Sequence, residues 1–311
     1  MRKKRYTVAC LSGDGIGPEV MAEASRALAE VSHLHGFQIE EVHAPFGGDA
    51  ARRFGHPLPA ATRAACRDAD AALVATTREP ALEGVKAELD LTWRITRVFL
   101  ARGELALVSP LAEDAVDLAV ERAFALACNR RGCVTLVGFD PRWRASVASA
   151  AERNAGVAVK HLTFEAALTR IIRDPSGFDV LASEQPLAEA LTGTAAFAHE
   201  GTRMVASGRL SATGPGVFGP THGSADEIAG QGVANPSGML LAAALMLGEG
   251  LGERTAARTL EAAVTETLQT GVRTPDMVTS GAGATTREFM SVLLAALPGA
   301  RADAEFTGVA A

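Results

Sequence analysis

The chain has 311 residues, and its 30 basic and 36 acidic side chains leave a formal net charge of −6. Hydrophobic residues make up 48% of the chain and charged residues 21%, which excludes an intrinsically disordered protein and indicates one large or two modest globular domains. The lack of a basic excess argues against nucleic acid as a partner, because too few cations are available to neutralise phosphates.

Strand-like and helix-like segments alternate along the chain, which predicts an α/β protein with mostly parallel strand pairing. Apolar residues at helical spacing predict a helix that begins near Pro18 and another at 60–67. Short apolar runs predict strands at 6–11, 37–42, 71–75, 134–137, 157–159 and 178–182. The stretch 207–222 is rich in glycine, proline, serine and threonine, so we expect a loop there.

The last quarter of the chain is predicted to be helical. Asn235 and Pro236 form a strong helix start, a side-chain cap followed by proline in the first turn. The helix that follows, 237–247, is apolar nearly all round and should be buried. Two further helices are expected at 254–268 and 286–297. The most apolar run, 238–247, is far shorter than the ~20 residues of a membrane span, so no membrane partner is expected.

Four cysteines are scattered along the chain, Cys10, Cys66, Cys128 and Cys133, without a C-x-x-C pair or zinc-like spacing to histidines. Such cysteines are typical of buried thiols in a reducing compartment. The basic N-terminus is not followed by the apolar region of a secretion signal, so a cytoplasmic location is expected.

A glycine-rich octapeptide, Gly13-Asp14-Gly15-Ile16-Gly17-Pro18-Glu19-Val20, joins the first strand to the first helix. The dinucleotide fingerprint G-x-G-x-x-G would need glycine at Pro18, so the spacing does not predict a classical Rossmann fold. Taken alone, the segment reads as a tight turn whose glycines take positive φ. The octapeptide nevertheless resembles the N-terminal signature of the isocitrate and isopropylmalate dehydrogenases, the β-decarboxylating dehydrogenase family.

Further segments similar to this family follow in the same order along the chain. They are 46–48, 54–59, Leu91-Thr92-Trp93-Arg94, Phe178-Asp179-Val180, 220–225, 228–230, 233–236 and Thr274-Pro275-Asp276. The resemblance spans nearly the whole chain and is strongest to the isopropylmalate branch. It implies the family's two-domain α/β fold, with a discontinuous nucleotide-binding domain, 1–97 plus 203–311, and a smaller domain, 98–202, that carries a dimer interface.

The resemblance implies a nucleotide site on the loop after 220. Glu227 falls where NAD-using members carry an acidic residue for the ribose hydroxyls, and its charge would repel a 2′-phosphate, so NAD is expected rather than NADP. The other positions that match the family's adenosine and phosphate site are His222, Gly223, Ser224, Ala225 and Asn235.

The resemblance implies a 2-hydroxy dicarboxylic acid substrate similar to 3-isopropylmalate. The arginines that bind such a substrate in the family are only partly matched in this chain. Arg94 matches the first substrate arginine, in a segment that resembles a helix of the family, and Arg122 is a candidate for the third. The position of the second arginine is Glu104, which Arg97 or Arg102 could replace if the alignment shifts.

The family's divalent metal, Mg²⁺ or Mn²⁺, is held by three aspartates, and the matching positions are Glu165, Glu189 and Gly193. Two readings of the glutamates stay open, metal ligands or solvated charges on helix faces. Arg78 and Glu79 occupy a stretch that is glycine-rich in the family, and they either recognise a different ligand or face water.

The acid–base groups of the family are the poorest match. Tyr6 is the sole tyrosine and lies in the first predicted strand, and no segment matches the one that carries the family's catalytic tyrosine and intersubunit arm. Gly138-Phe139-Asp140 stands where the family has its proton-relay lysine. The four lysines are Lys3, Lys4, Lys86 and Lys160, and none matches that motif.

Three functional hypotheses are compatible with this pattern. The first is an NAD-dependent dehydrogenase acting on a 2-hydroxy acid. The second is a catalytically inactive paralogue that binds NAD or an acid, as a homodimer or as the regulatory partner of an active paralogue. The third is a scaffold whose pocket serves new chemistry through Asp140, Glu165 and Glu189.

Overall fold

A computed structural model describes residues 3–76, 79–100, 103–138, 140–198, 202–278 and 283–298. The chain divides into two compact units, of which unit 1 joins Met1–Leu89 to Pro215–Ala311 and unit 2 is Asp90–Gly214. The sequence placed these boundaries at 97/98 and 202/203. The observed ones differ because strands β4 (Trp93–Leu100) and β9 (Val205–Leu210) pair with each other within unit 2.

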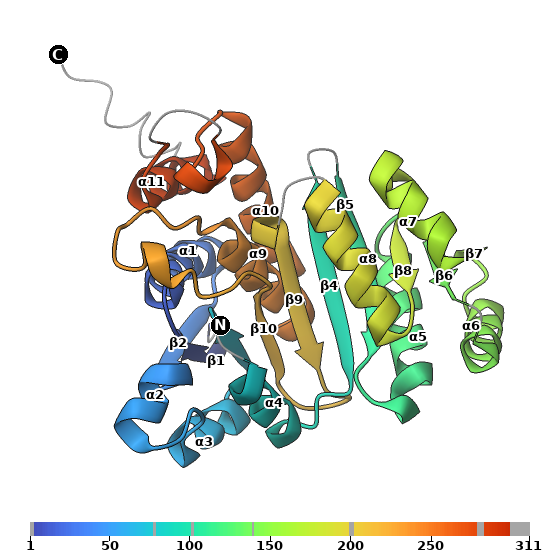
Figure 1. Cartoon of the computed structure of the whole chain (residues 1–311), viewed down its shortest axis with the longest axis horizontal. Coiled ribbons are helices and arrows are strands. Elements are labelled where there is room, and N and C mark those ends of the chain that lie inside the picture. The colour runs from blue at the N-terminus through green and yellow to red at the C-terminus, as the bar shows by residue number, and fades with distance from the viewer. Residues whose placement is uncertain are drawn as a thin grey trace. The chain divides into compact units, whose positions relative to one another are not determined.

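Unit 1 contains strands in the order β2-β1-β3-β10, and the pairs β1–β2, β1–β3 and β3–β10 are all parallel. Its strands are β1 (Arg5–Leu11), β2 (Gln38–His43), β3 (Ala71–Val74) and β10 (Gly216–Pro220). Its α-helices are α1 (Gly17–His35), α2 (Gly47–Phe54), α3 (Ala60–Asp68), α4 (Glu79–Glu88), α9 (Ser237–Leu245), α10 (Arg254–Gln269) and α11 (Thr286–Ala296). In Figure 1, α2, α3 and α4 lie below β1, and α1 and α9 to α11 lie above it.

The helix α9 forms the centre of unit 1. All nine of its residues are buried, and it packs against α1, α10 and β10. Its sequence is apolar on every face, which fits a helix with no exposed side. The predicted helix 237–247 ends two residues early, because a π-helical turn, Met246–Gly250, replaces its last part.

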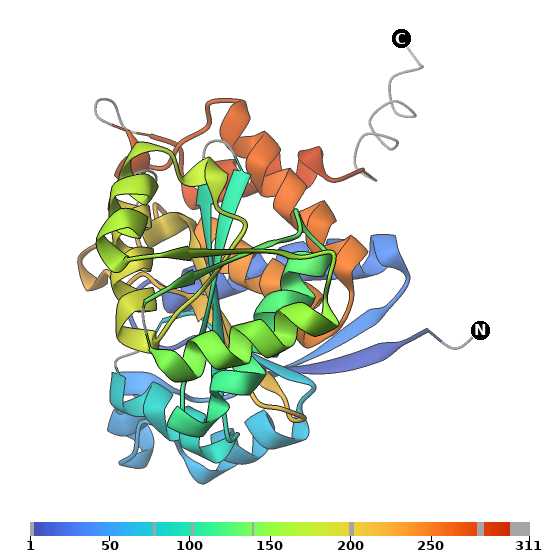
Figure 2. The ribbon, with the colours of Figure 1, turned by 90° about the vertical axis from the view of Figure 1, so that its right-hand side faces the viewer.

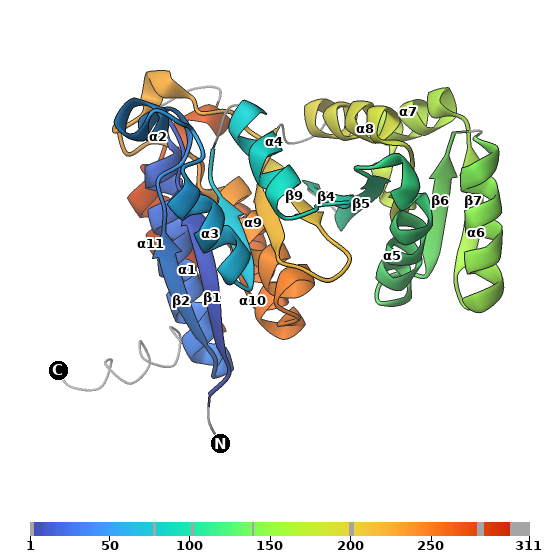
Figure 3. The ribbon, with the colours of Figure 1, turned by 90° about the horizontal axis from the view of Figure 1, so that it is seen from below.

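Unit 2 contains strands in the order β9-β4-β5-β8-β6-β7, antiparallel on either side of β4 and parallel beyond β5. Its further strands are β5 (Gly103–Pro110), β6 (Cys133–Val137), β7 (Ala158–Leu162) and β8 (Val180–Ala182). Its α-helices are α5 (Val116–Cys128), α6 (Pro141–Arg153), α7 (Phe164–Arg173) and α8 (Gln185–Ala198). Figure 3 shows α7 and α8 on one side of these strands and α5 and α6 on the other.

The predicted α/β class with mostly parallel pairing is confirmed, and two local predictions are wrong. The stretch 207–222 was expected to be a loop, but it contains the end of β9 and all of β10, because Val205–Leu210 and Gly216–Pro220 keep enough buried apolar side chains to pair as strands. Arg94 was expected on a helix and lies on strand β4, whose buried positions are chiefly apolar and β-branched. In the part of the chain that is described, every helix is too short or too polar to cross a membrane.

Candidate functional site

The glycine-rich turn after β1 is held by Asp14. Its carboxylate accepts hydrogen bonds from the Gly48 backbone N–H at 2.8 and 3.0 Å, at the start of α2. A Cβ atom on Gly47 or Gly48 would lie 2.6 or 2.8 Å from that carboxylate, so a side chain at either position would force the carboxylate to move. The Asp14 carboxylate thus links the turn to the Phe46-Gly47-Gly48 segment and stabilises the N-terminus of α2.

The same turn supports the predicted nucleotide loop. The Ile16 N–H donates to the Ser224 carbonyl at 2.8 Å, and a Cβ on Gly15, whose φ is +58°, would lie 2.0 Å from that carbonyl. Ala225 takes the left-handed conformation with φ of +43°, which is uncommon for a residue other than glycine. The Glu19 carboxylate accepts a hydrogen bond from the Gly230 N–H and so ties α1 to the far end of the loop.

Three buried polar atoms of the loop and the helix after it lack a hydrogen-bond partner among the described residues. They are His222 Nε2, Asn235 Nδ2 and Ser237 Oγ. The Asn235 Oδ1 accepts from the Ser237 N–H at 2.9 Å, so the amide is oriented and its Nδ2 donor is left over. Since buried polar atoms are nearly always paired, three in one segment indicate a site prepared for a polar ligand.

The protonation state of His222 follows from its surroundings. Burial lowers its pKa, against the opposing effects of its hydrogen bond to the Gly223 carbonyl and the charge of Asp276. The Nδ1–H donates to the Gly223 carbonyl at 3.1 Å, because a carbonyl oxygen can only accept. The neutral ring therefore presents Nε2 as a hydrogen-bond acceptor.

The remaining predicted residues of this loop are exposed or partly exposed. Gly223 and Glu227 are exposed, and Glu227 lies in the 3₁₀ turn Asp226–Ile228, where its backbone carbonyl accepts from Gln231 Nε2 at 2.7 Å. His222, Gly223, Ser224, Ala225, Glu227 and Asn235 thus lie on one continuous segment of unit 1, which runs from the end of β10 to the start of α9.

In unit 2, the predicted substrate arginine and a predicted metal ligand contact each other. Arg94 Nη1 lies 3.1 Å from Glu189 Oε1 on α8, and Arg94 Nε donates to Ser207 Oγ on β9 at 2.9 Å. The Arg94 side chain is 13% exposed and that of Glu189 is 54% exposed. The guanidinium therefore already has a carboxylate partner within its own unit.

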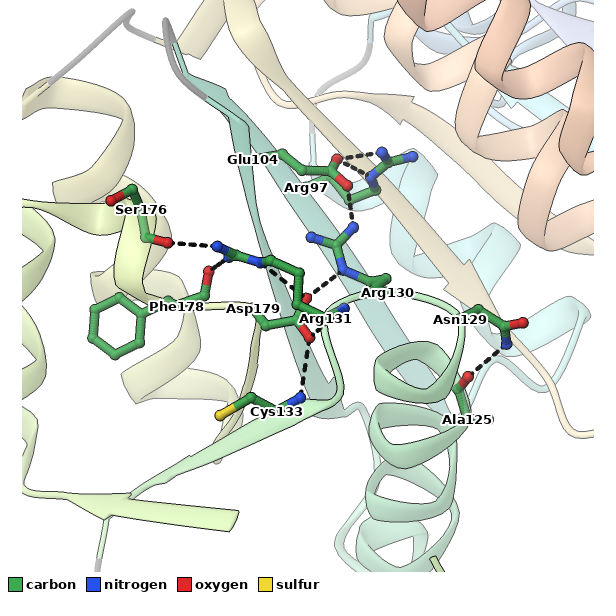
Figure 4. Close-up of polar contacts among 10 residues, drawn as sticks. All are labelled: Arg97, Glu104, Ala125, Asn129, Arg130, Arg131, Cys133, Ser176, Phe178 and Asp179. Atoms are coloured by element: carbon green, nitrogen blue, oxygen red, sulfur yellow. Dashed lines mark hydrogen bonds and ion pairs between the residues drawn. The ribbon is translucent and has the colours of Figure 1, made fainter. Parts of the chain in front are cut away.

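Arg97, the alternative to the missing second arginine, is also paired (Figure 4). Its guanidinium binds Glu104 through Nε at 2.6 Å and through Nη2, and the other Glu104 oxygen binds Arg130. Arg130 Nε in turn donates at 2.8 Å to Asp179, which is 2% exposed and also accepts from the backbone N–H groups of Arg131 and Cys133. Arg97, which was a candidate for substrate binding, thus belongs to a largely buried network with Glu104, Arg130 and Asp179. Arg102 lies outside the described residues.

The other predicted residues of unit 2 lie apart from this network. Arg122 is on α5, with its guanidinium 5.7 Å from the centre of the Trp93 ring. Glu165, in the first turn of α7, is exposed and lines a shallow depression together with Arg170 and Arg173. Arg78 lies outside the described residues, and α4 begins at Glu79.

A pocket of about 440 Å³ lies at the carboxyl ends of β5, β6 and β8. Asp140 lines it and caps α6 by accepting from the Arg142 and Trp143 N–H groups at 2.7 and 3.2 Å. Glu113 and Glu184 also line it and were missed in the sequence, although each follows a strand end, where α/β proteins place their ligands. Figure 2 shows α6 beside the strands β6 and β7.

Tyr6 serves the fold. Its hydroxyl lies 3.0 Å from the Leu251 carbonyl and 2.6 Å from Glu253, which also pairs with Lys4. Tyr6 is 7% exposed and packs edge-on against Phe37. Burial raises the pKa of this tyrosine, so its hydroxyl stays protonated at neutral pH.

The comparison with known proteins decides the family. The model of the isocitrate/isopropylmalate dehydrogenase family matches residues 7–99 and 103–293. The chain belongs to this family. A 3-isopropylmalate dehydrogenase of Synechococcus sp. (strain CC9902) is 33% identical over an alignment of 338 residues that covers 89% of this chain and 95% of the relative. A chloroplastic 3-isopropylmalate dehydrogenase of Arabidopsis thaliana is 31% identical, with 90% and 84% covered.

Solved structures agree with this membership. A β-decarboxylating dehydrogenase from Thermococcus kodakarensis, in its apo form, superimposes with a TM-score of 0.84 at 26% identity, covering 96% of this chain and 98% of that one. An isocitrate dehydrogenase from Methylococcus capsulatus has the same fold, with a TM-score of 0.80 at 22% identity and 94% and 99% covered. The fold implied by the octapeptide and the loop 220–225 is therefore confirmed for this isocitrate/isopropylmalate dehydrogenase family member.

Proposed function

We propose that this family member binds NAD through its loop 222–237 and does not oxidise 3-isopropylmalate at the rate of an intact dehydrogenase. The observation that carries the proposal is the set of three buried polar atoms without a partner, His222 Nε2, Asn235 Nδ2 and Ser237 Oγ. His222 Nε2 is an acceptor and Asn235 Nδ2 is a donor, a combination that suits the amino group and a ring nitrogen of adenine, and both atoms would be satisfied on binding.

The loop fits NAD better than NADP. Glu227 is exposed in the turn after Ala225, so its carboxylate is available to accept from ribose hydroxyls. A 2′-phosphate would meet the charges of both Asp226 and Glu227 there. NAD, when bound, would supply a hydride acceptor.

The predicted metal ligands do not fit a Mg²⁺ or Mn²⁺ site within one chain. Glu189 is paired with Arg94, so a divalent cation there would have to displace the guanidinium and tolerate its charge. Glu165 is exposed in a separate depression, which Arg170, Arg173 and Asp174 also line, and Glu189 is not part of that lining. No step of the proposed function therefore involves a metal.

The described tyrosine and lysine side chains are also poor candidates for the family's acid–base catalysis. Tyr6 is bound to Glu253 and Leu251, Lys4 pairs with Glu253, and Lys86 pairs with Glu83. General acid–base groups typically contribute about 10²–10⁴-fold each to a rate. The loss of two such groups would leave the chain with little turnover even if the acid binds.

Calorimetric titration with NAD, followed by a sensitive NADH assay over a panel of 2-hydroxy acids with and without Mn²⁺, tests the proposal. We expect stoichiometric NAD binding, weaker NADP binding and no turnover of 3-isopropylmalate. Asn235→Ala should weaken NAD binding about fivefold or more, because one buried hydrogen bond is lost. Gln269→Ala, at the exposed end of α10 and outside the loop, should leave NAD binding unchanged. Failure of the wild-type chain to bind NAD would refute the proposal.

The second candidate function is an active NAD-dependent dehydrogenase on another 2-hydroxy acid. It is favoured by the match to a 3-isopropylmalate dehydrogenase over 95% of that protein's length. The pocket beside Asp140, Glu113 and Glu184 would then supply the proton acceptor that the family's lysine and tyrosine no longer provide. NADH formation that is abolished by Asp140→Asn would favour this candidate.

We also propose a homodimer formed through α7 and α8 in a cytoplasmic protein. Phe197 is 89% exposed and Ile172 is 57% exposed, and the helices that carry them pack on each other. Large apolar side chains at such exposure are typical of contact surfaces. Light scattering should give twice the chain mass, and Phe197→Ser should shift it toward the monomer. A heterodimer with an active paralogue would instead leave the isolated chain monomeric.

A further inference from the structure

A cysteine, a glutamate and a histidine meet on one face of the unit 1 sheet, at the edge formed by β1 and β2. Cys10 on β1 is the direct register partner of His43 on β2, and Glu41 precedes His43 by two residues. Register partners on neighbouring parallel strands, and residues two apart on one strand, point to the same face. The strand pairing therefore brings the three side chains together.

The three side chains offer one thiol sulfur, one carboxylate oxygen and one imidazole nitrogen that all lie within 4.8 Å of one another. Among the described residues, no other group of three or more histidine, cysteine, aspartate and glutamate side chains is gathered in this way. His43 Nε2 lies 3.1 Å from Glu41 Oε2, and Ser25 on α1 donates to the same carboxylate oxygen at 2.7 Å. The carboxylate is thus oriented from outside the group, as a metal ligand usually is.

The distances and exposure suit an ion that enters from solvent. Ligands of tetrahedral zinc, with bonds of about 2.0–2.3 Å, lie about 3.3–3.8 Å apart, so a modest rotation would close the group. The His43 side chain is 58% exposed, so it has room for this rotation. Glu41 is 19% exposed, and Cys10 is buried. Burial, and to a lesser degree the charge of Glu41, raises the pKa of the Cys10 thiol to about 12, and a bound cation would favour the thiolate.

We propose that Cys10, Glu41 and His43 form a Zn²⁺ site with three protein ligands and a fourth position open to solvent. The mixed sulfur, nitrogen and oxygen set suits zinc better than Mg²⁺ or Ca²⁺, which prefer oxygen alone. The ion would join the edge strand β2 to its neighbour β1. This site is separate from the nucleotide loop, which contains none of the three residues.

The full-length protein, stripped with a chelator, should bind one Zn²⁺ per chain in a competition titration with a chromogenic chelator. Co²⁺ in place of Zn²⁺ should give a thiolate-to-metal charge-transfer band in the near ultraviolet. Cys10→Ser should abolish the band, and His43→Gln should weaken Zn²⁺ binding about 100-fold or more. Ser25→Ala should weaken it about tenfold, since Ser25 only orients Glu41.

Matched controls separate this site from adventitious binding. Cys66 is a second buried thiol, whose pKa burial raises to about 11, and Cys66→Ser should leave both the band and the affinity unchanged. His33 is exposed on α1 outside the group, so His33→Gln should also have no effect. Absence of the charge-transfer band in the wild-type protein, or an equal band in Cys10→Ser, would overturn the proposal. His43→Gln keeps the buried core intact, so the test does not depend on Cys10→Ser folding.

Discussion

Arg94 and Glu189 form an ion pair, with Arg94 Nη1 3.1 Å from Glu189 Oε1. The sequence assigns the first to a substrate carboxylate and the second to a divalent metal, and the structure pairs them with each other. A carboxylate on α8 thus occupies the guanidinium that a dicarboxylate substrate would need. Because Glu189 is 54% exposed, the pair is worth no more than about 1 kcal/mol, and a ligand could still displace it.

The first prediction concerns that competition. Glu189→Ala should raise the affinity for 3-isopropylmalate about twofold to fivefold, because the acid no longer has to displace an internal carboxylate from Arg94. Calorimetric titration measures the change. Glu165→Ala removes an exposed carboxylate that lies elsewhere in unit 2 and serves as the control. Equal affinities in all three proteins would contradict a competition between Glu189 and the acid for Arg94.

The second prediction concerns the contact between Gly15 and the nucleotide loop. Gly15→Ala should both destabilise the fold and weaken NAD binding, because its Cβ would lie 2.0 Å from the Ser224 carbonyl. Gly36 has a similar φ of +75° with nothing near its Cβ position. Gly36→Ala should therefore cost only the about 1–2 kcal/mol of a left-handed alanine and leave NAD binding unchanged. Urea unfolding and NAD titration of both variants distinguish clash from backbone strain.

The third prediction concerns the buried network around Asp179. Asp179→Asn should lower the free energy of unfolding by about 3 kcal/mol, because Arg130 loses a fully buried carboxylate partner. Glu121→Gln removes a pair to Arg153 whose side chains are 61% and 56% exposed, and it should cost less than about 0.5 kcal/mol. Urea denaturation measures both. A loss in Asp179→Asn as small as the one expected for Glu121→Gln would mean that the network adds little stability.

The fourth prediction concerns pH. The pKa of His222 is lowered in the folded state, chiefly by burial, so below pH about 6.5 the unfolded chain binds a proton that the folded chain excludes. Stability should therefore fall as pH drops through that value, and His222→Gln, which cannot titrate, should show a smaller fall. Melting temperatures of the two proteins between pH 7.5 and 5.5 measure the difference. A larger fall in the variant would contradict the assigned neutral state.

Local sequence signals predicted much of unit 1. The strands at 6–11, 37–42 and 71–75 and the helices at 60–67 and 254–268 agree with the structure to within one or two residues, because each has its own apolar period or caps. The strands β4, β5, β9 and β10 were not predicted. Trp93–Leu100 pairs with Gly103–Pro110 on one side and with Val205–Leu210 on the other, and no local pattern reports such pairings.

The site residues also divide into those that the sequence identifies and those whose contacts only the tertiary structure shows. The sequence by itself determined the family and the α/β fold and predicts the position of a nucleotide loop, because these depend on short segments with strict backbone requirements, such as the glycines beside Asp14 and Ser224. Only the tertiary structure decided the partners of the charged residues. It placed Glu189 on Arg94, Glu104 on Arg97, and Cys10 beside His43. Such contacts join residues that are often far apart in the chain, and their strength depends on burial and strand register, which a sequence does not display.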